Sequence, residues 1–206
     1  MRLTVLGATG GIGKLLIPLA LERGHQVTAF ARAPEKIARN GNGSHLRVLG
    51  GDLYNPRQMA EAIRGSDAVL SAFGPTTLRR THLRRDFART LVSALHLSGV
   101  SRFLHVSSAF CFQDDGSLLY SFMTSTLFRN VTADHRDADV ELSQPDLEWT
   151  ILRPPRLLDG PPKRNLRIVA GHRPKALTIT RADVAEFMLH EAESSMYVRQ
   201  YVGLSD

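Results

Sequence analysis

The sequence has a single cysteine and no long apolar run, and each scarcity excludes a class of protein. Cys111 alone cannot form an intramolecular disulfide, and no paired Cys/His spacing of a zinc site is present. We therefore expect a reducing compartment and no bound metal. No apolar run reaches the roughly 18 residues of a membrane helix, and the first strand leads at once into a glycine-rich turn instead of a signal peptide. We predict a cytoplasmic protein with no membrane partner.

The sequence has fewer acidic than basic residues, with 20 Asp and Glu and 26 Lys and Arg, which gives a formal net charge of +6. Such a molecule attracts anions, including phosphorylated cofactors. The arginines are spread along the chain without a zinc finger, a basic zipper or an aromatic RNA-binding motif, so no nucleic-acid partner is expected. The length of 206 residues, without an evident boundary, suits one domain.

Short apolar runs alternate with helical stretches along the chain. Strands are predicted at residues 3–6, 26–30, 46–49, 68–72, 103–106 and 148–152, with a last strand near 197–202 that closes the sheet or lies at its edge. Helices are predicted at residues 11–23, 34–39, 56–64, 78–98, 134–142 and 181–193, and a loop at 153–174. The alternation predicts an α/β fold: a single Rossmann-type domain over residues 1–206, with a parallel sheet flanked by helices on both faces.

Three glycines, Gly7, Gly10 and Gly13, separate the first strand from the first helix. The first permits a tight turn, the second lets the backbone approach a pyrophosphate, and the third allows close helix packing. The N–H groups at the helix start then face the phosphates. A glycine-rich turn can also serve only as a connection, but its position between a strand and a helix favours a dinucleotide site.

The end of the second predicted strand distinguishes NADP from NAD. NAD enzymes usually carry an acidic residue there, whereas this chain has Arg32, followed by Lys36. The two cations suit a 2′-phosphate, although they could also be solvated surface residues. Asp52 is placed to meet the adenine, or is a turn residue. We predict NADP(H) as the cofactor.

With these residues the chain resembles the atypical short-chain dehydrogenase/reductases of the NAD(P)H-binding, NmrA-like group, and among them the NADPH-dependent flavin reductases, also called biliverdin reductases B. The resemblance covers nearly the whole chain. The matching segments are Gly7-Ala8-Thr9-Gly10, Arg32 with Lys36, Gly51-Asp52-Leu53, Asp67-Ala68-Val69, Ser107-Ser108-Ala109-Phe110, Val131-Thr132-Ala133-Asp134-His135, Pro154-Pro155 and the run from Ala182 to Leu189.

The resemblance implies a cofactor-binding set spread over several segments. The implied residues are Gly7, Thr9, Gly10, Gly11, Ile12 and Gly13 at the pyrophosphate, Arg32 and Lys36 at the 2′-phosphate, Asp52 and Leu53 beside the adenine, Phe73, Gly74 and Pro75 under the cofactor, Val106 and Ser107 near the nicotinamide, and Pro155, Arg156 and Leu157 at the border of the substrate pocket. Two departures alter the pocket rim: Arg156 replaces a histidine of the flavin reductases, and residues 79–85 are more basic. The acceptor therefore stays open.

A tyrosine followed four residues later by a lysine is absent from the sequence. In ordinary short-chain dehydrogenases that lysine lowers the pKa of the tyrosine, which then exchanges a proton with a carbonyl or alcohol. Its absence disfavours that chemistry. Flavins, quinones and conjugated tetrapyrroles delocalise the incoming charge, so stacking the acceptor on the nicotinamide would be the main catalytic act.

Two side chains are candidate catalytic groups. Ser108 could donate a hydrogen bond to the acceptor, or could satisfy the backbone at a strand end. His135 could orient the substrate or supply a proton near neutral pH, or could be a surface histidine at a helix start. Cys111 is most simply a small core residue. A cationic stretch on the predicted fourth helix is a solvated face or reaches over the cofactor. Its members are Arg79, Arg80, Arg84, Arg85 and Arg89.

The sequence thus predicts an NADPH-dependent reductase of the atypical short-chain type, acting on a flavin, quinone or tetrapyrrole-like acceptor as a monomer or weak homodimer. The alternative is a non-catalytic NADP(H) sensor that changes partners with the redox state of the cofactor. An isomerase or epimerase is disfavoured by the missing tyrosine and lysine pair and by the short C-terminal region.

Overall fold

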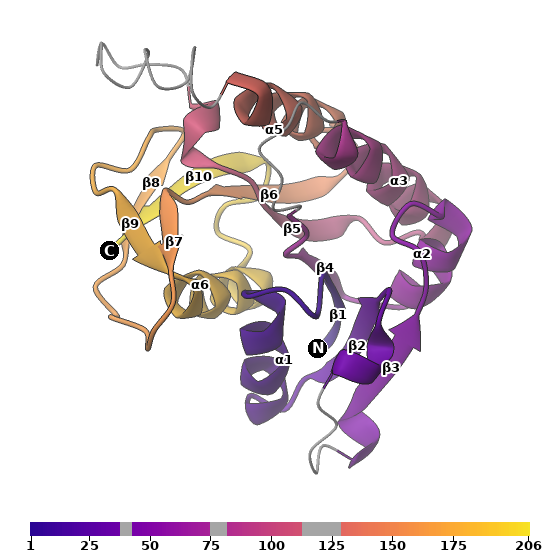
Figure 1. The fold of residues 1–206 in the computed structure, drawn as a ribbon. Helices are drawn as coiled ribbons and strands as arrows, with labels where there is room; N and C mark the ends of the chain where they lie inside the picture. The colour runs from indigo at the N-terminus through magenta and orange to yellow at the C-terminus, as the bar shows by residue number, and fades with distance from the viewer. Residues whose placement is uncertain (38–42, 75–81, 113–128) are drawn as a thin grey trace.

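The computed structural model describes the whole chain except residues 38–42, 75–81 and 113–128. Its centre is an eight-stranded sheet in the order β3-β2-β1-β4-β5-β6-β10-β8, with a separate pair β7-β9 (Figure 1). The strands are β1 (Arg2–Leu6), β2 (Gln26–Ala31), β3 (Leu46–Gly50), β4 (Ala68–Ser71), β5 (Arg102–Val106), β6 (Glu148–Arg153), β7 (Arg156–Leu158), β8 (Arg167–Ala170), β9 (Thr178–Thr180) and β10 (Gln200–Ser205).

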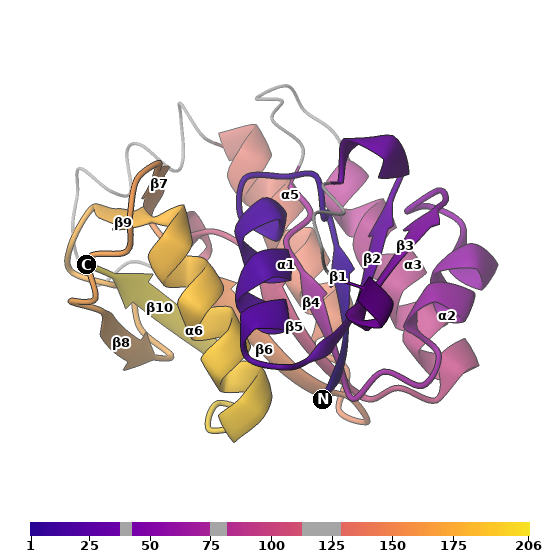
Figure 2. The same cartoon turned by 90° about the horizontal axis from the view of Figure 1, so that it is seen from below.

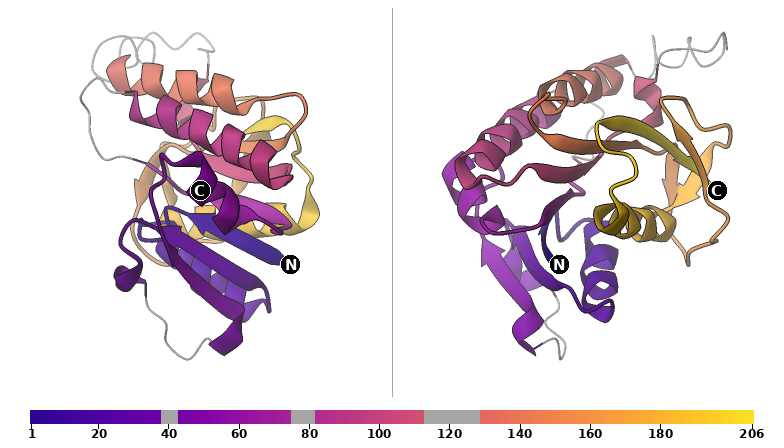
Figure 3. Two further views of the ribbon diagram at one scale, coloured as in Figure 1. Left: turned by 90° about the vertical axis from the view of Figure 1, so that its right-hand side faces the viewer. Right: turned by 180° about the vertical axis from the view of Figure 1, so that it is seen from behind.

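Helices cover both faces of the sheet, as predicted. One face carries α1 and α6, which lie side by side in Figure 2, and the other carries α2, α3 and α5, seen across the sheet from them in both views of Figure 3. Their bounds are α1 (Gly13–Glu22), α2 (Pro56–Ile63), α3 (Leu83–Ser98), α5 (Arg129–Leu142) and α6 (Arg181–Ser194), with 3₁₀ turns η1 (Pro34–Lys36), η2 (Gly43–His45) and η3 (Ala109–Cys111).

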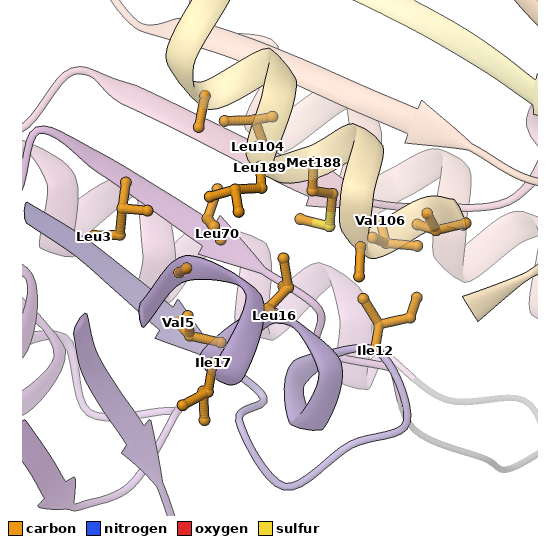
Figure 4. Close-up of a cluster of buried hydrophobic side chains, with 14 of the residues drawn as sticks. Leu3, Val5, Ile12, Leu16, Ile17, Leu70, Leu104, Val106, Met188 and Leu189 are labelled. Atoms are coloured by element: carbon orange, nitrogen blue, oxygen red, sulfur yellow. The ribbon is translucent and has the colours of Figure 1, made fainter. Parts of the chain in front are cut away.

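The central strands are apolar on both sides because each side faces a layer of helices. Along β1, Leu3 and Val5 point to the α1/α6 side while Leu6 joins the opposite cluster. Figure 4 shows the first of these clusters, in which Leu16 of α1 and Met188 of α6 meet the strand side chains. The short apolar runs of the sequence therefore form the central strands, which have a hydrophobic cluster on each side.

The strand order reverses beside β1. The chain moves outward from β1 to β2 and β3, then returns to β4 on the other side of β1, and all of these neighbours are parallel. In open parallel sheets, ligands bind at the carboxyl ends of the strands where the order reverses. The predicted α/β Rossmann-type fold is confirmed, and this topology places the glycine-rich turn at that point.

The C-terminal part differs from the prediction. Residues 153–174 are not a simple loop, since they contain β7 and β8. The last strand, β10, lies between β6 and β8 and not at the edge, parallel to β6 and antiparallel to β8. The strands β7 and β8 escaped prediction because each has only two or three consecutive apolar residues, too few for a clear strand pattern.

Three helices also differ from their predicted bounds. The predicted helix at 34–39 is a 3₁₀ turn that ends at Lys36, and residues 38 and 39 lie outside the described part. The helix containing His135 begins at Arg129, so this histidine lies in mid-helix and not at a helix start. The predicted helix at 78–98 begins at Leu83 with His82 as its N-cap, and residues 78–81 lie outside the described part.

None of the helices in the described part of the chain is long and apolar enough to cross a membrane. Across the same residues, no group of three or more His, Cys, Asp or Glu side chains is placed to hold a metal ion. The cellular location stays a prediction.

Candidate functional site

The turn between β1 and α1 is built so closely that it tolerates no side chain at two of its glycines. A Cβ on Gly7 would lie 2.9 Å from the carbonyl carbon of Ala72, and the φ of Gly7 is +75°. A Cβ on Gly13 would lie 2.3 Å from the carbonyl oxygen of Gly7. The turn therefore packs against the end of β4 and against itself, which leaves the backbone as its outer surface.

Backbone groups at the start of α1 face the carboxyl edge of the sheet. Gly10 N–H closes the turn on the carbonyl of Gly7 at 2.9 Å, and Lys14 N–H bonds to the carbonyl of Gly10. Ile12, at the N-cap, provides no side-chain cap and is buried in the core beneath the turn. Thr9 is half-buried and Gly11 is exposed. This arrangement fits a pyrophosphate, because uncapped helix N–H groups favour anions.

Two exposed cations follow β2. Arg32 directly follows the strand, and Lys36 closes the turn η1. Among the residues that the structure describes, the ion pairs involve neither Arg32 nor Lys36. Their charges thus remain available to an anion at the end of β2, the position that the sequence assigned to the 2′-phosphate.

The segment after β3 combines a turn residue with a buried one. The Asp52 carboxylate accepts the N–H of Tyr54 at 3.0 Å, which is the turn interaction that the sequence left open. Leu53 is 4% exposed and belongs to the core, so only its backbone borders the predicted adenine position. Burial raises the pKa of Tyr54, which keeps this phenol protonated.

An aromatic stack lies beneath the end of β4. Phe73 stacks on Phe87 at a centroid distance of 4.3 Å and meets the edge of Tyr54 at 6.2 Å. Gly74 is exposed, and a Cβ there would meet no atom within 4 Å. Pro75, the third residue predicted under the cofactor, lies outside the described residues.

The carboxyl end of β5 brings the predicted nicotinamide residues to the same edge of the sheet. Val106 and Ser107 are buried, at 8% and 7% exposure, while Ser108 is half-buried. The Ser108 hydroxyl accepts the N–H of Phe110 at 3.3 Å and so caps η3. That bond uses one acceptor site and leaves the hydroxyl proton for another partner.

His135 comes from α5 and reaches the end of β5. Its Nδ1 lies 3.4 Å from the Ser107 hydroxyl. Burial, followed by the nearby Arg84 guanidinium, holds the pKa of His135 well below its usual range. At neutral pH the ring is therefore uncharged, and it can position Ser107 better than it can act as an acid.

An ion pair that the sequence did not predict lies one helical turn further on. Arg153, at the end of β6, donates from Nε and Nη2 to the Asp139 carboxylate at 3.0 and 2.8 Å. Its guanidinium lies over the Tyr201 ring, 3.8 Å from the centroid. Burial raises the pKa of Asp139 to about 6 against the opposing effect of Arg153. The spacing of His135 and Asp139 by four residues was the available signal, since it puts both on one helix face.

The last predicted group borders β7. Pro155 is half-buried, Arg156 is exposed and begins the strand, and Leu157 packs against the α1/α6 core. The Arg156 N–H bonds to the carbonyl of Leu177, which joins this segment to β9. Arg156 is exposed, and its place at the border of a substrate pocket stays a prediction.

Three arginines of the cationic stretch lie in the described part of the chain, and each of them forms an ion pair. Arg84 pairs with the buried Asp134 at 3.3 Å and Arg89 with Glu141 at 2.7 Å, so both tie α3 to α5. Arg85 contacts Asp86 on its own helix. Arg79 and Arg80 lie outside the described residues. Arg84 and Arg89 thus join two helices, while Arg85 pairs within α3, and a contact of this stretch with the cofactor stays a prediction.

A glycine cradle at the reversal point of a parallel sheet, followed by cations after β2, defines a Rossmann-type dinucleotide-binding protein. The chain belongs to the NAD(P)H-binding family, whose model matches residues 7–195. The uncharacterized protein YwnB of Bacillus subtilis is 30% identical over 169 residues, which are 80% of this chain and 76% of YwnB. A 3-beta-hydroxysteroid dehydrogenase of Mycolicibacterium neoaurum is 30% identical over 119 residues, 52% of this chain but 32% of that enzyme. The chain thus spans about a third of this longer relative.

Solved structures share the whole fold. A candidate NADH-flavin reductase of Streptococcus pneumoniae superposes with a TM-score of 0.81 at 25% identity, over 100% of this chain and 99% of that one. The anaerobilin reductase ChuY of Escherichia coli O157:H7 gives 0.80 at 23% identity, over 99% and 96%. A short-chain dehydrogenase/reductase of Veillonella parvula in complex with NADP gives 0.82 at 22%, over 100% and 94%.

Proposed function

We propose that this protein is an NADPH-dependent reductase that passes a hydride to a conjugated acceptor such as a flavin, a quinone or a tetrapyrrole. The observation that carries the proposal is the glycine cradle, in which Gly7 and Gly13 have no room for a Cβ and the first turn of α1 has no side-chain cap. Bound NADPH supplies the hydride. The protein supplies position and electrostatics.

NADPH is favoured over NADH by the charges at the end of β2. Arg32 and Lys36 can donate to a 2′-phosphate, whereas the acidic residue that would accept the ribose hydroxyls of NAD is missing from this position. Charge-assisted hydrogen bonds of this kind contribute roughly 1.5–3 kcal/mol each. The residues implied by the family resemblance at the nicotinamide, Val106, Ser107 and Ser108, stay proposals.

The acceptor class follows from what the site can do with protons. His135 is held uncharged by its burial, and the sequence lacks the tyrosine and lysine pair, so neither of these usual acids is available to a carbonyl among the described residues of the site. An acceptor that delocalises charge can take its proton from water, while the Ser108 hydroxyl donates a hydrogen bond to it. Relatives include a candidate NADH-flavin reductase and an anaerobilin reductase, which supports this class.

The test is a titration of the purified protein with NADPH and NADH, followed by NADPH oxidation with flavin mononucleotide, menadione and biliverdin in turn. We expect tighter binding of NADPH and turnover with at least one acceptor. Arg32→Ala should weaken NADPH binding about tenfold or more and leave NADH binding nearly unchanged. Arg57→Ala, an exposed cation on α2, is the matched control and should change neither.

Two results would decide against the proposal. Tight NADPH binding without turnover of any acceptor would favour the non-catalytic sensor. If neither NADPH nor NADH binds, both the reductase and the sensor hypotheses are wrong. The monomeric or weakly dimeric state predicted from the sequence is checked on the same material by light scattering.

A further inference from the structure

Arg181, the first residue of α6, lies across the glycine turn. A Cβ built on Gly11 would stand 2.7 Å from the Cδ and 2.8 Å from the Nε of Arg181. The contact joins positions far apart in the sequence, and it is possible because α6 lies beside α1 with both helices starting at the same edge of the sheet (Figure 2). The side chain thus occupies the space that a side chain at position 11 would need.

The guanidinium is oriented by an ion pair on one side only. Nη1 of Arg181 contacts Oδ1 of Asp159 at 2.7 Å, and the Asp159 side chain is 93% exposed. Exposed ion pairs contribute little to the stability of a fold, so the main effect of this contact is to orient the Arg181 side chain. Arg181 keeps its remaining N–H groups, since a guanidinium has five donors.

The start of α6 does not need Arg181 for its own capping. Thr180 accepts the N–H of Asp183 at 3.0 Å, and the Asp183 carboxylate accepts the N–H groups of Lys163 and Arg164. Asp183 is thereby occupied by backbone donors. Apart from its exposed pair with Asp159, the contact of Arg181 that the structure describes is the one with the glycine turn.

We propose that Arg181 is a further cofactor-binding residue, whose guanidinium donates to the pyrophosphate held by the glycine turn. The inference rests on the proposed function. A pyrophosphate is anionic and offers adjacent oxygens, which a planar guanidinium matches with two donors. The proposal also explains the glycine at position 11: a side chain there would displace the arm of Arg181.

The experiment compares two ligands by calorimetry. NADPH contains the pyrophosphate, and adenosine 2′-monophosphate retains the adenine and the 2′-phosphate without it. Arg181→Ala should weaken NADPH binding about tenfold to a hundredfold and change the affinity for adenosine 2′-monophosphate less than about twofold. Arg32→Ala should weaken both ligands. Arg164→Ala removes an equal charge from a 78% exposed side chain nearby and should affect neither.

A double-mutant cycle separates a direct contact from a general disturbance. Gly11→Ala should weaken NADPH binding in the wild type and much less in the Arg181→Ala background, because its effect is to displace that arginine. Arg181→Ala binding NADPH as tightly as Arg164→Ala would overturn the proposal, as would equal losses for both ligands. If the wild type binds both ligands and Arg181→Ala binds them with the same affinities, the role proposed for Arg181 is wrong and the proposed reductase function is unaffected. If the wild type does not bind NADPH, both the proposed reductase function and the role proposed for Arg181 are wrong.

Discussion

At the scale of single residues, Gly13 has the least room in the site. Gly13→Ala places a Cβ 2.3 Å from a backbone oxygen that cannot swing aside, so we expect a loss of roughly 1–3 kcal/mol in the free energy of unfolding and at least about tenfold weaker NADPH binding. Urea unfolding and calorimetry measure the two quantities.

Gly24→Ala is the control for this substitution. The φ of Gly24 is +78°, but a Cβ there meets no atom within 4 Å. It should cost about 1–2 kcal/mol through backbone strain alone and leave NADPH binding unchanged. Wild-type affinity in Gly13→Ala would show that the cradle is not the coenzyme site.

Asp139 gives a residue-level prediction for pH. Burial raises its pKa from 3.8 to about 6, so the folded state keeps the proton over a range in which the unfolded chain has lost it. The stabilisation is complete below about pH 4 and is lost as the pH rises through about 6. Relative to Asp139→Asn, the wild type should therefore lose roughly 2–3 kcal/mol of unfolding free energy between about pH 4 and pH 7.

Urea unfolding of both proteins across this range measures the difference. Asp137→Asn, an exposed neighbour on α5, should give a nearly constant difference from the wild type. A wild type that instead gains stability relative to Asp139→Asn as the pH rises would mean that Arg153 holds the carboxylate ionised and outweighs burial.

At the scale of elements, a buried ion pair joins α6 to the sheet. Arg102 of β5 contacts Glu191 of α6 at 2.8 Å, with 6% and 0% of their side chains exposed. Glu191 also accepts the N–H groups of Met196 and Tyr197, which fixes the end of the helix. The pair therefore joins the C-terminal end of α6 to the first residue of β5.

Arg102→Met should cost about 3–5 kcal/mol of unfolding free energy, because it leaves Glu191 buried without its cation. Arg2→Met is the matched control, since its pair with Asp67 is 60% and 37% exposed and should contribute less than about 1 kcal/mol. Denaturant unfolding at neutral pH compares them. Equal losses in the two variants would contradict the importance assigned to burial.

The elements nearest the core were the ones that the sequence predicted well. β1 and β5 read as predominantly apolar runs because both of their sides face helices, and Pro56 marks the start of α2. β8 has only three consecutive apolar residues and lies in a segment rich in Pro, Arg and Gly, so its short run was not recognised as a strand. Its pairing with β10 is decided by contacts between distant segments.

The candidate site also has a part that the sequence predicted and a part that it did not. The spacing of the glycines and the charge at Arg32 are local signals, and the sequence was sufficient to propose them. Arg181 against Gly11 and Arg153 against Asp139 depend on how separate elements meet, which no local pattern encodes. Tertiary contacts thus supplied the residues that sequence reasoning missed.

At the scale of the whole molecule, Cys111 reports on opening of the fold. The thiol is 4% exposed, and burial raises its pKa to about 12, so the native protein should resist an aromatic disulfide reagent near about pH 8. Reaction then requires unfolding. At free NADPH of about 100 times Kd the labelling rate should fall about 100-fold, because the coenzyme binds only the folded state.

Absorbance of the released thiolate follows this reaction, with Cys111→Ala as the unreactive control. Rapid labelling of the native protein, at the rate of the chain in strong denaturant, would contradict the buried placement. An unchanged rate with saturating NADPH would mean that labelling proceeds through a local opening.

The pair β7 and β9 forms a small second sheet that packs on the α1/α6 core through Leu157 and Ile179, and Asp159, just after β7, pairs with Arg181. Residues 156–166, which precede β8, lie outside the main sheet and can diverge while the eight-stranded scaffold stays intact. We expect chimeras that exchange this insert with a homologue to fold, keep their coenzyme and acquire the donor's choice of oxidant. Evolution would then have a ready means of retargeting one ancestral reductase to new electron acceptors.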